Sequence, residues 1–222
     1  GLILNNMRLP EMNRADLFAI IAGCRAGEKR VVELCDRFGK DVYLAACQAL
    51  LDRTYEAMRK LIHLAIPEVP QSFEDYIDDD GISEDPIKLC VKLTIGDGEI
   101  VADYTGTAKQ VRGALNATES FTKANTYLAL RCVFESDLPN NGGFFRPIKV
   151  IAPRGTIFNV EHPGACAARG LTGFRQTDLV LGALAKAVPD RVIAAPEGGN
   201  TFVTIGGHDP QHGAFVHCDI IF

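Results

Sequence analysis

Asp178 has a position in the sequence that calls for a chemical explanation. It falls on the apolar face of a helix predicted over residues 173–188, and a buried carboxylate costs on the order of several kcal/mol unless a cation pairs with it. Arg175, one helical turn earlier, and Arg169 are the available cations. A buried salt bridge that fixes the helix explains this pattern, and a direct catalytic role for Asp178 is the alternative.

The segment before this helix has the residue types of an anion site. Residues 165–175 combine small side chains with two arginines at a predicted helix start. Backbone N–H groups and guanidinium groups together bind carboxylates and phosphates well. We therefore predict that Arg169, Thr172 and Arg175 bind an anionic substrate or a phosphorylated intermediate. The alternative is that the small residues serve close packing and the arginines lie on the surface.

The loop Thr105–Gly106–Thr107 follows a predicted strand and offers hydroxyl and N–H groups that could also hold an anion or orient a substrate. It is not a P-loop, because no lysine follows in the Gly-x-x-x-x-Gly-Lys-Ser/Thr pattern, and the chain has no Gly-x-Gly-x-x-Gly fingerprint. Any ATP chemistry is therefore expected from another chain.

The sequence predicts no metal site of its own. The stretch 78–81 fails the spacing of a calcium loop. His208 and His212 flank Pro210, with His217 beyond, and a solvent-exposed hairpin tip explains them better than a metal cluster does. The 7 cysteines are scattered without a Cys-x-x-Cys pair, which favours reduced thiols.

Composition narrows the class of protein. The 222 residues are 47% hydrophobic and 23% charged, with a formal net charge of −5, and no basic cluster indicates a nucleic-acid groove. No apolar run reaches the ~18 residues of a membrane span, and no signal-peptide pattern opens the chain, so we expect a cytoplasmic protein. Glycine at position 1 and the buried-strand pattern at the end predict a fragment of a longer polypeptide.

The predicted elements indicate an α+β fold. Two long amphipathic helices, over 13–39 and 44–65, are expected to form an antiparallel hairpin that serves packing or oligomerisation, which defines a helical region at 1–67. Residues 68–222 form a mixed α/β region in which 68–85 is expected to be a solvated acidic turn. Antiparallel and mixed sheets are predicted from strands at 87–93, 100–104, 148–152, 156–160, 201–206 and 214–222, with further helices at 118–132 and 173–188.

Six sequence patterns in register resemble one family. They are Asn6–Pro10 leading to Asp16-Leu17, Tyr55–Arg59, Tyr76–Gly81, the loop Asp103–Asn116, the turn Asn140–Pro147, and Gly182–Leu184 followed by Gly206-Gly207. Together they resemble the B-type subunit of the hydantoinase, 5-oxoprolinase and acetone or acetophenone carboxylase family. The turn adds Arg146 to the expected substrate-binding or anion-binding residues.

The resemblance implies part of the B subunit of an ATP-dependent amidohydrolase that opens cyclic amides of the hydantoin or 5-oxoproline type. It also implies an A-type subunit that binds ATP, an oligomeric complex, and a divalent metal held by residues N-terminal to Gly1. Residues 169–175 replace the Gly-Asn-x-Glu-Thr-Ser pattern of many oxoprolinase-like members. A subunit of a ketone carboxylase is therefore an alternative, and a non-catalytic assembly module is a third.

Overall fold

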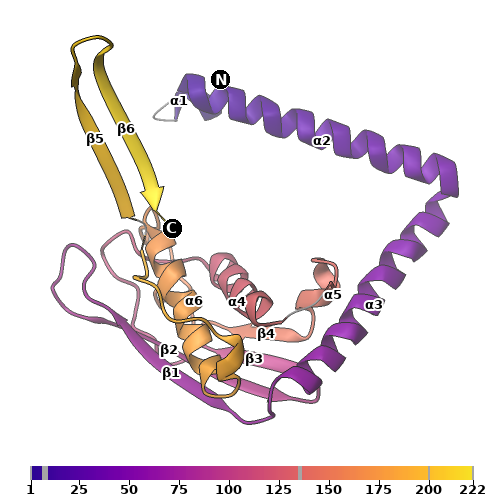
Figure 1. The fold of residues 1–222 in the computed structure, drawn as a ribbon. Coiled ribbons are helices and arrows are strands. Elements are labelled where there is room, and N and C mark those ends of the chain that lie inside the picture. Colours follow the sequence, from indigo (N-terminus) through magenta and orange to yellow (C-terminus); the bar gives the residue numbers. More distant parts are fainter. Residues whose placement is uncertain (1, 7–9, 135–136, 200, 222) are drawn as a thin grey trace. The chain divides into compact units, whose positions relative to one another are not determined.

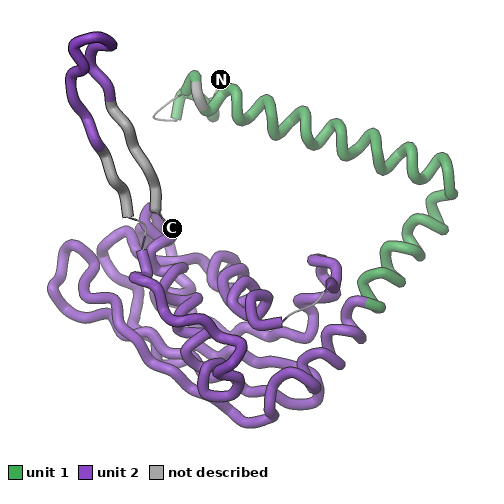
Figure 2. Tube along the Cα trace, viewed as in Figure 1, with its two compact units in different colours: residues 1–53 green, residues 54–222 purple. Residues whose placement is uncertain are grey.

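The structure is a computed structural model that describes residues 2–6, 10–134, 137–199 and 201–221, without side-chain positions at 12, 201–204 and 216–221. The chain divides into two compact units, residues 1–53 and 54–222 (Figure 2). Each unit is described by itself.

The first unit is helical. It contains α1 (Leu2–Asn5), α2 (Pro10–Phe38) and the first half of α3 (Lys40–Ala65). Gly39 separates the two long helices with a φ of +87°, a left-handed conformation that glycine adopts without strain, and its N–H donates to the Cys35 carbonyl at 2.8 Å. The predicted helix end at Gly39 is confirmed.

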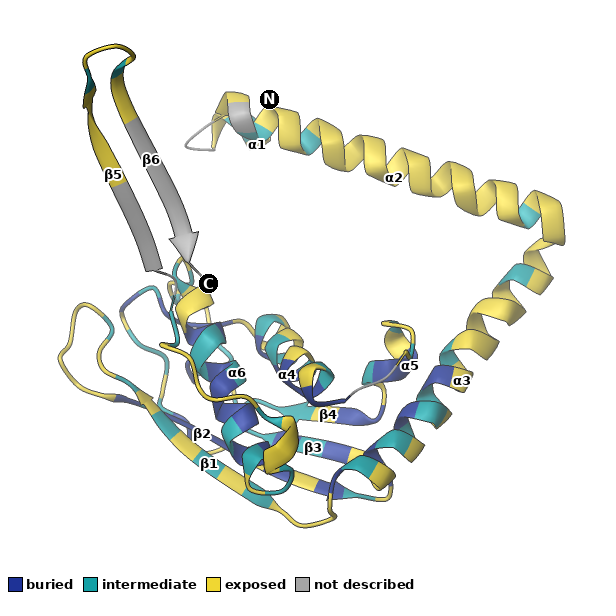
Figure 3. Ribbon diagram, in the orientation of Figure 1, coloured by how far each residue is buried: buried dark blue, intermediate teal, exposed yellow. Residues whose placement is uncertain are grey.

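The predicted antiparallel packing of α2 against α3 is not present among the described residues. None of them is buried in this unit, and large apolar side chains such as Phe18 and Ile20 are about 60% exposed (Figure 3). The reason lies in the sequence. Residues 15–24 and 42–51 are apolar around nearly the whole helix circumference, so a single neighbouring helix cannot cover them.

The second unit is built on a four-stranded sheet. The strand order is β1-β2-β3-β4, antiparallel except for the parallel pair β3 and β4 (Figure 1). A tight turn at Asp97-Gly98, where both residues have positive φ, joins β2 to β3 as predicted. The strands are β1 (Gln71–Ile77), β2 (Ile87–Gly96), β3 (Glu99–Asp103) and β4 (Ile148–Ile151).

Two helices cover one face of this sheet. These are α4 (Glu119–Val133) and α6 (Arg169–Ala185), and they pack on each other as well as on the strands (Figure 1). Thr118 caps α4 by accepting the Phe121 N–H, as predicted. The fully buried side chains between helices and sheet include Leu89, Leu93, Ile100, Leu130 and Leu179. The fold class is α+β. Shorter helices lie at α5 (Gly142–Phe145) and η1 (Pro189–Arg191).

The predicted strand at 156–160 is wrong. These residues form turns with isolated bridges, because the Thr156 hydroxyl donates to the Pro153 carbonyl at 2.7 Å and the Asn159 amide to the Ala152 carbonyl at 2.7 Å. Such side-chain bonds to nearby backbone favour turns over strands.

The final strand pair is confirmed as a separate two-stranded sheet, β5 (Thr201–Asp209) and β6 (Gly213–Ile221). Its tip is the predicted exposed turn, where the Asp209 carboxylate accepts the N–H groups of Gln211 and His212. The His217 side chain lies outside the described residues.

The acidic stretch at 68–85 is not only a solvated turn. Strand β1 occupies its first part, and exposure alternates along it: Phe73, Asp75 and Ile77 are half-buried, whereas Glu74 and Tyr76 are exposed. This alternation is the mark of a strand with one face on a core. A carboxylate, Asp75, therefore lies on the inward face among apolar neighbours.

Among the described helices, none combines the length and the apolar character needed to cross a membrane.

Candidate functional site

Helix α6 approaches strand β1 closely because Gly182 has no side chain. A Cβ at Gly182 would lie 2.7 Å from a ring carbon of Phe73. The buried side of α6 carries Thr172, whose hydroxyl donates to the Leu115 carbonyl, and Gln176, whose amide donates to the Tyr104 hydroxyl at 3.0 Å. These contacts fix which residues of α6 face β1.

A charged cluster lies where α6 faces β1. Arg175 forms ion pairs with Asp75 of β1 and with Asp178 one turn along α6, the latter at 3.4 Å. The side chains are 24%, 26% and 8% exposed for Arg175, Asp75 and Asp178. The expected cationic partner of Asp178 is therefore confirmed as Arg175. Asp75 is a member that the sequence did not predict.

The environment of Asp178 raises its pKa. Burial is the main cause, because it disfavours the charged form, and the nearby Asp75 carboxylate acts in the same direction. Arg175 opposes both by stabilising the carboxylate. Carboxyls with raised pKa values gather at functional sites but also occur in structural ion pairs.

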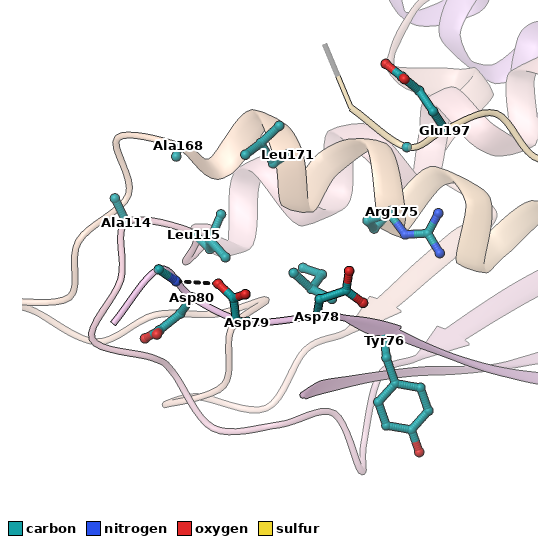
Figure 4. A pocket seen from close by; sticks show the side chains of 13 residues that line it. Tyr76, Asp78, Asp79, Asp80, Ala114, Leu115, Ala168, Leu171, Arg175 and Glu197 are labelled. Atoms are coloured by element: carbon teal, nitrogen blue, oxygen red, sulfur yellow. Dashed lines mark hydrogen bonds between the residues drawn. The ribbon is translucent and has the colours of Figure 1, made fainter. Parts of the chain in front are cut away.

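A cavity of about 630 Å³ lies beside Arg175, and we call it the polar cavity because Asp78, Asp79, Asp80 and Glu197 also line it. Asp78 and Asp79 come from the loop after β1, and Arg175 lies on α6 across from them (Figure 4). The guanidinium of Arg175 is already paired with two carboxylates, so the lining favours a neutral or cationic guest over an anion. The lining residues are Tyr76, Ile77, Asp78, Asp79, Asp80, Gly81, Ala114, Leu115, Ala168, Leu171, Arg175, Glu197 and Gly198.

Asp80 joins the two loops that form one wall of this polar cavity. Its carboxylate accepts the N–H groups of Ser83 at 2.7 Å, Ile82 at 2.9 Å and Gly113 at 2.9 Å. The approach at Gly113 is so close that a Cβ there would lie 2.1 Å from the Asp80 carbonyl oxygen. The wall therefore depends on one carboxylate and one glycine.

These hydrogen bonds predict a pH dependence of stability. The N–H groups, first that of Ser83 and then that of Gly113, hold the pKa of Asp80 below its ordinary value. A lowered folded-state pKa stabilises the protein above the unfolded-state pKa of about 4, and this stability is lost as the pH falls through the folded value.

We call this loss of stability at low pH the acid limb. We expect Asp80→Asn to flatten the acid limb when the free energy of unfolding in urea is measured from pH 2 to 6. Asp137→Asn, which removes an exposed carboxylate, should leave the acid limb in place. An unchanged acid limb in Asp80→Asn would show that the carboxylate is not responsible.

A second cavity, of about 430 Å³, lies between α4 and α6. Asp178 lines this cavity, whereas Arg175 lines the polar one, so the charged cluster contributes to both. The second lining is mainly apolar: Phe121, Asn125, Leu128, Cys132, Gly170, Gly173, Phe174, Thr177, Asp178, Leu181, Arg191, Ile193 and Pro196. We call it the apolar cavity.

The other predicted residues of the α6 start do not join the cluster. Arg169 is exposed, donates to the Cys166 carbonyl at 3.2 Å and stacks over Phe121 at 5.4 Å. Thr172 is fully buried, and its hydroxyl is bonded to backbone. Neither residue lines the polar or the apolar cavity.

Three more predicted residues lie elsewhere in the second unit. Thr105 donates to the Asp103 carboxylate at 2.6 Å, and the buried Thr107 hydroxyl exchanges hydrogen bonds with the Cys90 backbone. Arg146 lies over the Tyr55 ring at 5.5 Å. None of the three lines the two cavities, so their proposed binding roles stay predictions.

Among the described residues, no group of three or more His, Cys, Asp or Glu side chains could hold a metal ion. The divalent metal implied by the resemblance was expected on residues N-terminal to Gly1, so it stays a prediction, and the function proposed below routes no step through one.

The fold and the charged cluster define the class of protein. It is an α+β module in which helix α6 carries charged residues that line two cavities. The family model described as hydantoinase B/oxoprolinase matches residues 1–222, and the chain belongs to this family. The resemblance seen in the sequence is confirmed.

Relatives of known name support this assignment. The B subunit of a putative D-/L-hydantoinase from a Pseudomonas species is 30% identical over 99% of this chain and 38% of its own length. The crystal structure of ATP-dependent caprolactamase from Pseudomonas jessenii matches 97% of this chain and 37% of that chain, with a TM-score of 0.80 at 27% identity.

A nucleotide-free acetone carboxylase structure shares the fold, with a TM-score of 0.73 at 15% identity over 89% of this chain and 28% of its own. The chain spans little more than a third of the first curated relatives that it matches, 36% and 38% of their lengths.

Proposed function

We propose that this chain is part of the B subunit of an ATP-dependent amidohydrolase that opens cyclic amides of the hydantoin or 5-oxoproline type. The observation that carries the proposal is the match to the ATP-dependent caprolactamase over 97% of the chain. The family match over residues 1–222 supports it.

We also propose that ATP is bound by a partner, the A-type subunit. The sequence has neither a P-loop nor a dinucleotide fingerprint, and the hydantoinase relative is named as one subunit of an enzyme. A cytoplasmic location is proposed as well, because the cysteines with described side chains are free thiols.

Within this function, Arg175 and Asp178 are the proposed site residues. Both lie on α6, they are paired, and each lines a cavity large enough for a small molecule. The carboxylates around the polar cavity favour a neutral amide over an anion, so we assign Arg175 a positioning role rather than an anion-binding one. The mainly buried Asp178 carboxyl is the candidate acid or base.

Two alternatives keep specific support. The shared fold with acetone carboxylase and the arginine-rich segment 169–175 favour a ketone carboxylase subunit. The helices of the first unit, in which none of the described residues is buried, favour a non-catalytic assembly module.

Purification of the full-length protein with its candidate A subunit separates the three. ATP hydrolysis stimulated by hydantoin, 5-oxoproline or caprolactam supports the amidohydrolase, and stimulation by a ketone with bicarbonate supports the carboxylase. Assembly without either stimulation would contradict both enzymes and leave the assembly module.

Asp178→Asn should separate function from stability. Because the folded-state pKa of Asp178 is raised, ionising this carboxyl costs stability as the pH rises from the unfolded-state pKa of about 4 through the folded value. The amide has no such cost, and Arg175 keeps Asp75. We therefore expect the free energy of unfolding at pH 7 to be unchanged or slightly raised. Turnover of the complex should fall about ten-fold or more.

Asp190→Asn, at an exposed position of η1, is the control and should change neither quantity. Wild-type turnover in Asp178→Asn would exclude Asp178 from the chemistry.

A further inference from the structure

The apolar cavity between α4 and α6 has the dimensions of a small-molecule site. Its volume of about 430 Å³ lies within the ~300–1,000 Å³ of known ligand pockets. Gly173 lets the Phe121 ring pack tightly, since a Cβ there would lie 2.9 Å from that ring. The hydrocarbon part of the lining comes from three segments: Phe121 and Leu128 of α4, Phe174 and Leu181 of α6, and Ile193 and Pro196 beyond η1.

The few polar atoms of the apolar cavity have unused hydrogen-bonding capacity. Asp178 Oδ2 faces Arg175 at 3.4 Å, and none of the described residues donates a hydrogen bond to Oδ1. Asn125 donates its amide N–H to the Phe121 carbonyl at 3.0 Å, which leaves its amide oxygen as an acceptor. Both residues line the cavity, and neither oxygen is among the fully buried atoms without a hydrogen-bond partner. Arg191, which is exposed and also lines the cavity, adds a donor.

This combination suits one class of ligand. A lactam has one N–H, which a carboxylate or amide oxygen accepts, and one carbonyl, which a guanidinium can donate to. The rest of a lactam is hydrocarbon, which gains by leaving water for an apolar lining. A ligand with its own carboxylate would be repelled by Asp178 and Asp75, whose two charges exceed that of Arg175, although Arg191 offsets part of this.

We propose that the apolar cavity binds the ring of an uncharged, mainly hydrocarbon lactam, with the Asp178 carboxyl and the Asn125 amide oxygen facing the lactam N–H. This inference rests on the proposed function and names its substrate class. It assigns Leu128, Phe174 and Leu181 to substrate specificity.

Cys132 gives a test that does not depend on turnover. This exposed thiol lines the apolar cavity, whereas the exposed Cys24 and Cys47 lie on α2 and α3. The full-length complex is labelled with N-ethylmaleimide, with and without caprolactam, and each cysteine is followed by peptide mass spectrometry. Caprolactam at ~90% occupancy should slow labelling of Cys132 about ten-fold and leave Cys24 and Cys47 unchanged. Slowing should be weaker with 5-oxoproline.

The outcomes separate this inference from the proposed function. Undiminished labelling of Cys132 at caprolactam concentrations that stimulate ATP hydrolysis overturns the cavity assignment and leaves the amidohydrolase standing. Cys132 that does not react even without ligand also overturns it, because another part of the complex then covers the cavity. If no lactam stimulates ATP hydrolysis, the proposed amidohydrolase function is wrong. In that case, protection of Cys132 by caprolactam would still support a lactam-binding site in the apolar cavity, and the absence of protection would refute it.

A matched pair of variants adds a second test. Leu128 is 53% exposed and lines the apolar cavity, whereas Leu64 is 83% exposed on α3 and does not. Leu128→Glu places a charge on the lining, so the caprolactam concentration for half-protection of Cys132 should rise about ten-fold or more. Leu64→Glu should leave it unchanged. Equal effects of the two substitutions would contradict the proposal.

Discussion

Arg175→Ala is expected to destabilise the second unit by about 2–4 kcal/mol, because removing one partner of a buried ion pair leaves an uncompensated charge. Here it would leave two carboxylates, Asp75 at 26% and Asp178 at 8% exposure, without the cation between them. The loss should appear as a lower urea midpoint at pH 7. Turnover of the assembled complex should fall as well, since both cavities share this cluster.

Arg154→Ala is the matched control for Arg175→Ala. Arg154 also pairs with a carboxylate, Glu161 at 3.2 Å, but its side chain is 81% exposed, and such surface pairs contribute ~0–1 kcal/mol. Adding Asp75→Asn to Arg175→Ala should restore part of the lost stability, because only one carboxylate then remains. If the loss of stability in the double variant equals the sum of the losses in the two single variants, Arg175 and Asp75 do not interact.

The part of the charged cluster within α6 could be predicted because it is local. Apolar residues at helical spacing fix which face of α6 is buried, so Asp178 had to be inside, and Arg175 is within reach at one turn. The structure bears out both points. Local periodicity is enough when both partners lie on one helix.

Asp75 could not be found in the same way because its partner is 100 residues away. A signal was present: Gln71, Phe73, Asp75 and Ile77 alternate with exposed residues. It was hidden because a carboxylate stands where a strand normally has an apolar residue, in a stretch rich in acidic residues. A carboxylate that breaks a strand pattern is itself a sign of a site.

The residues of the predicted anion site do not line one common cavity, for a related reason. Sequence proximity placed Arg169, Thr172 and Arg175 together, but each step of three residues rotates the side-chain direction by about 60°, so Arg169 and Arg175 point about 120° apart. Thr172 faces the core, Arg169 faces solvent, and only Arg175 reaches the polar cavity. The carboxylates that surround Arg175 arrive from other segments, so the charge of the site was not readable from 165–175 alone.

Gly113→Ala should destabilise the second unit by about 3 kcal/mol or more, through overpacking against backbone that cannot move aside cheaply. An alanine Cβ at Gly113 would lie 2.1 Å from the Asp80 carbonyl oxygen and 2.9 Å from the Asp80 Cβ. Relief requires the loop of Asp80 to separate from residue 113, which breaks the hydrogen bond from the Gly113 N–H to the Asp80 carboxylate. The acid limb of stability that Asp80 provides should shrink together with the urea midpoint.

Gly170→Ala is the stability control for Gly113→Ala, because it makes the same chemical change in open space. No atom lies within 4 Å of a Cβ at Gly170, in the first turn of α6, and alanine favours a helix over glycine by about 0.5–1 kcal/mol. Its urea midpoint should be equal to or above that of the wild type. If Gly113→Ala were as stable as Gly170→Ala, the two loops would not be held together at this contact, and Asp80 would not define a wall of the polar cavity.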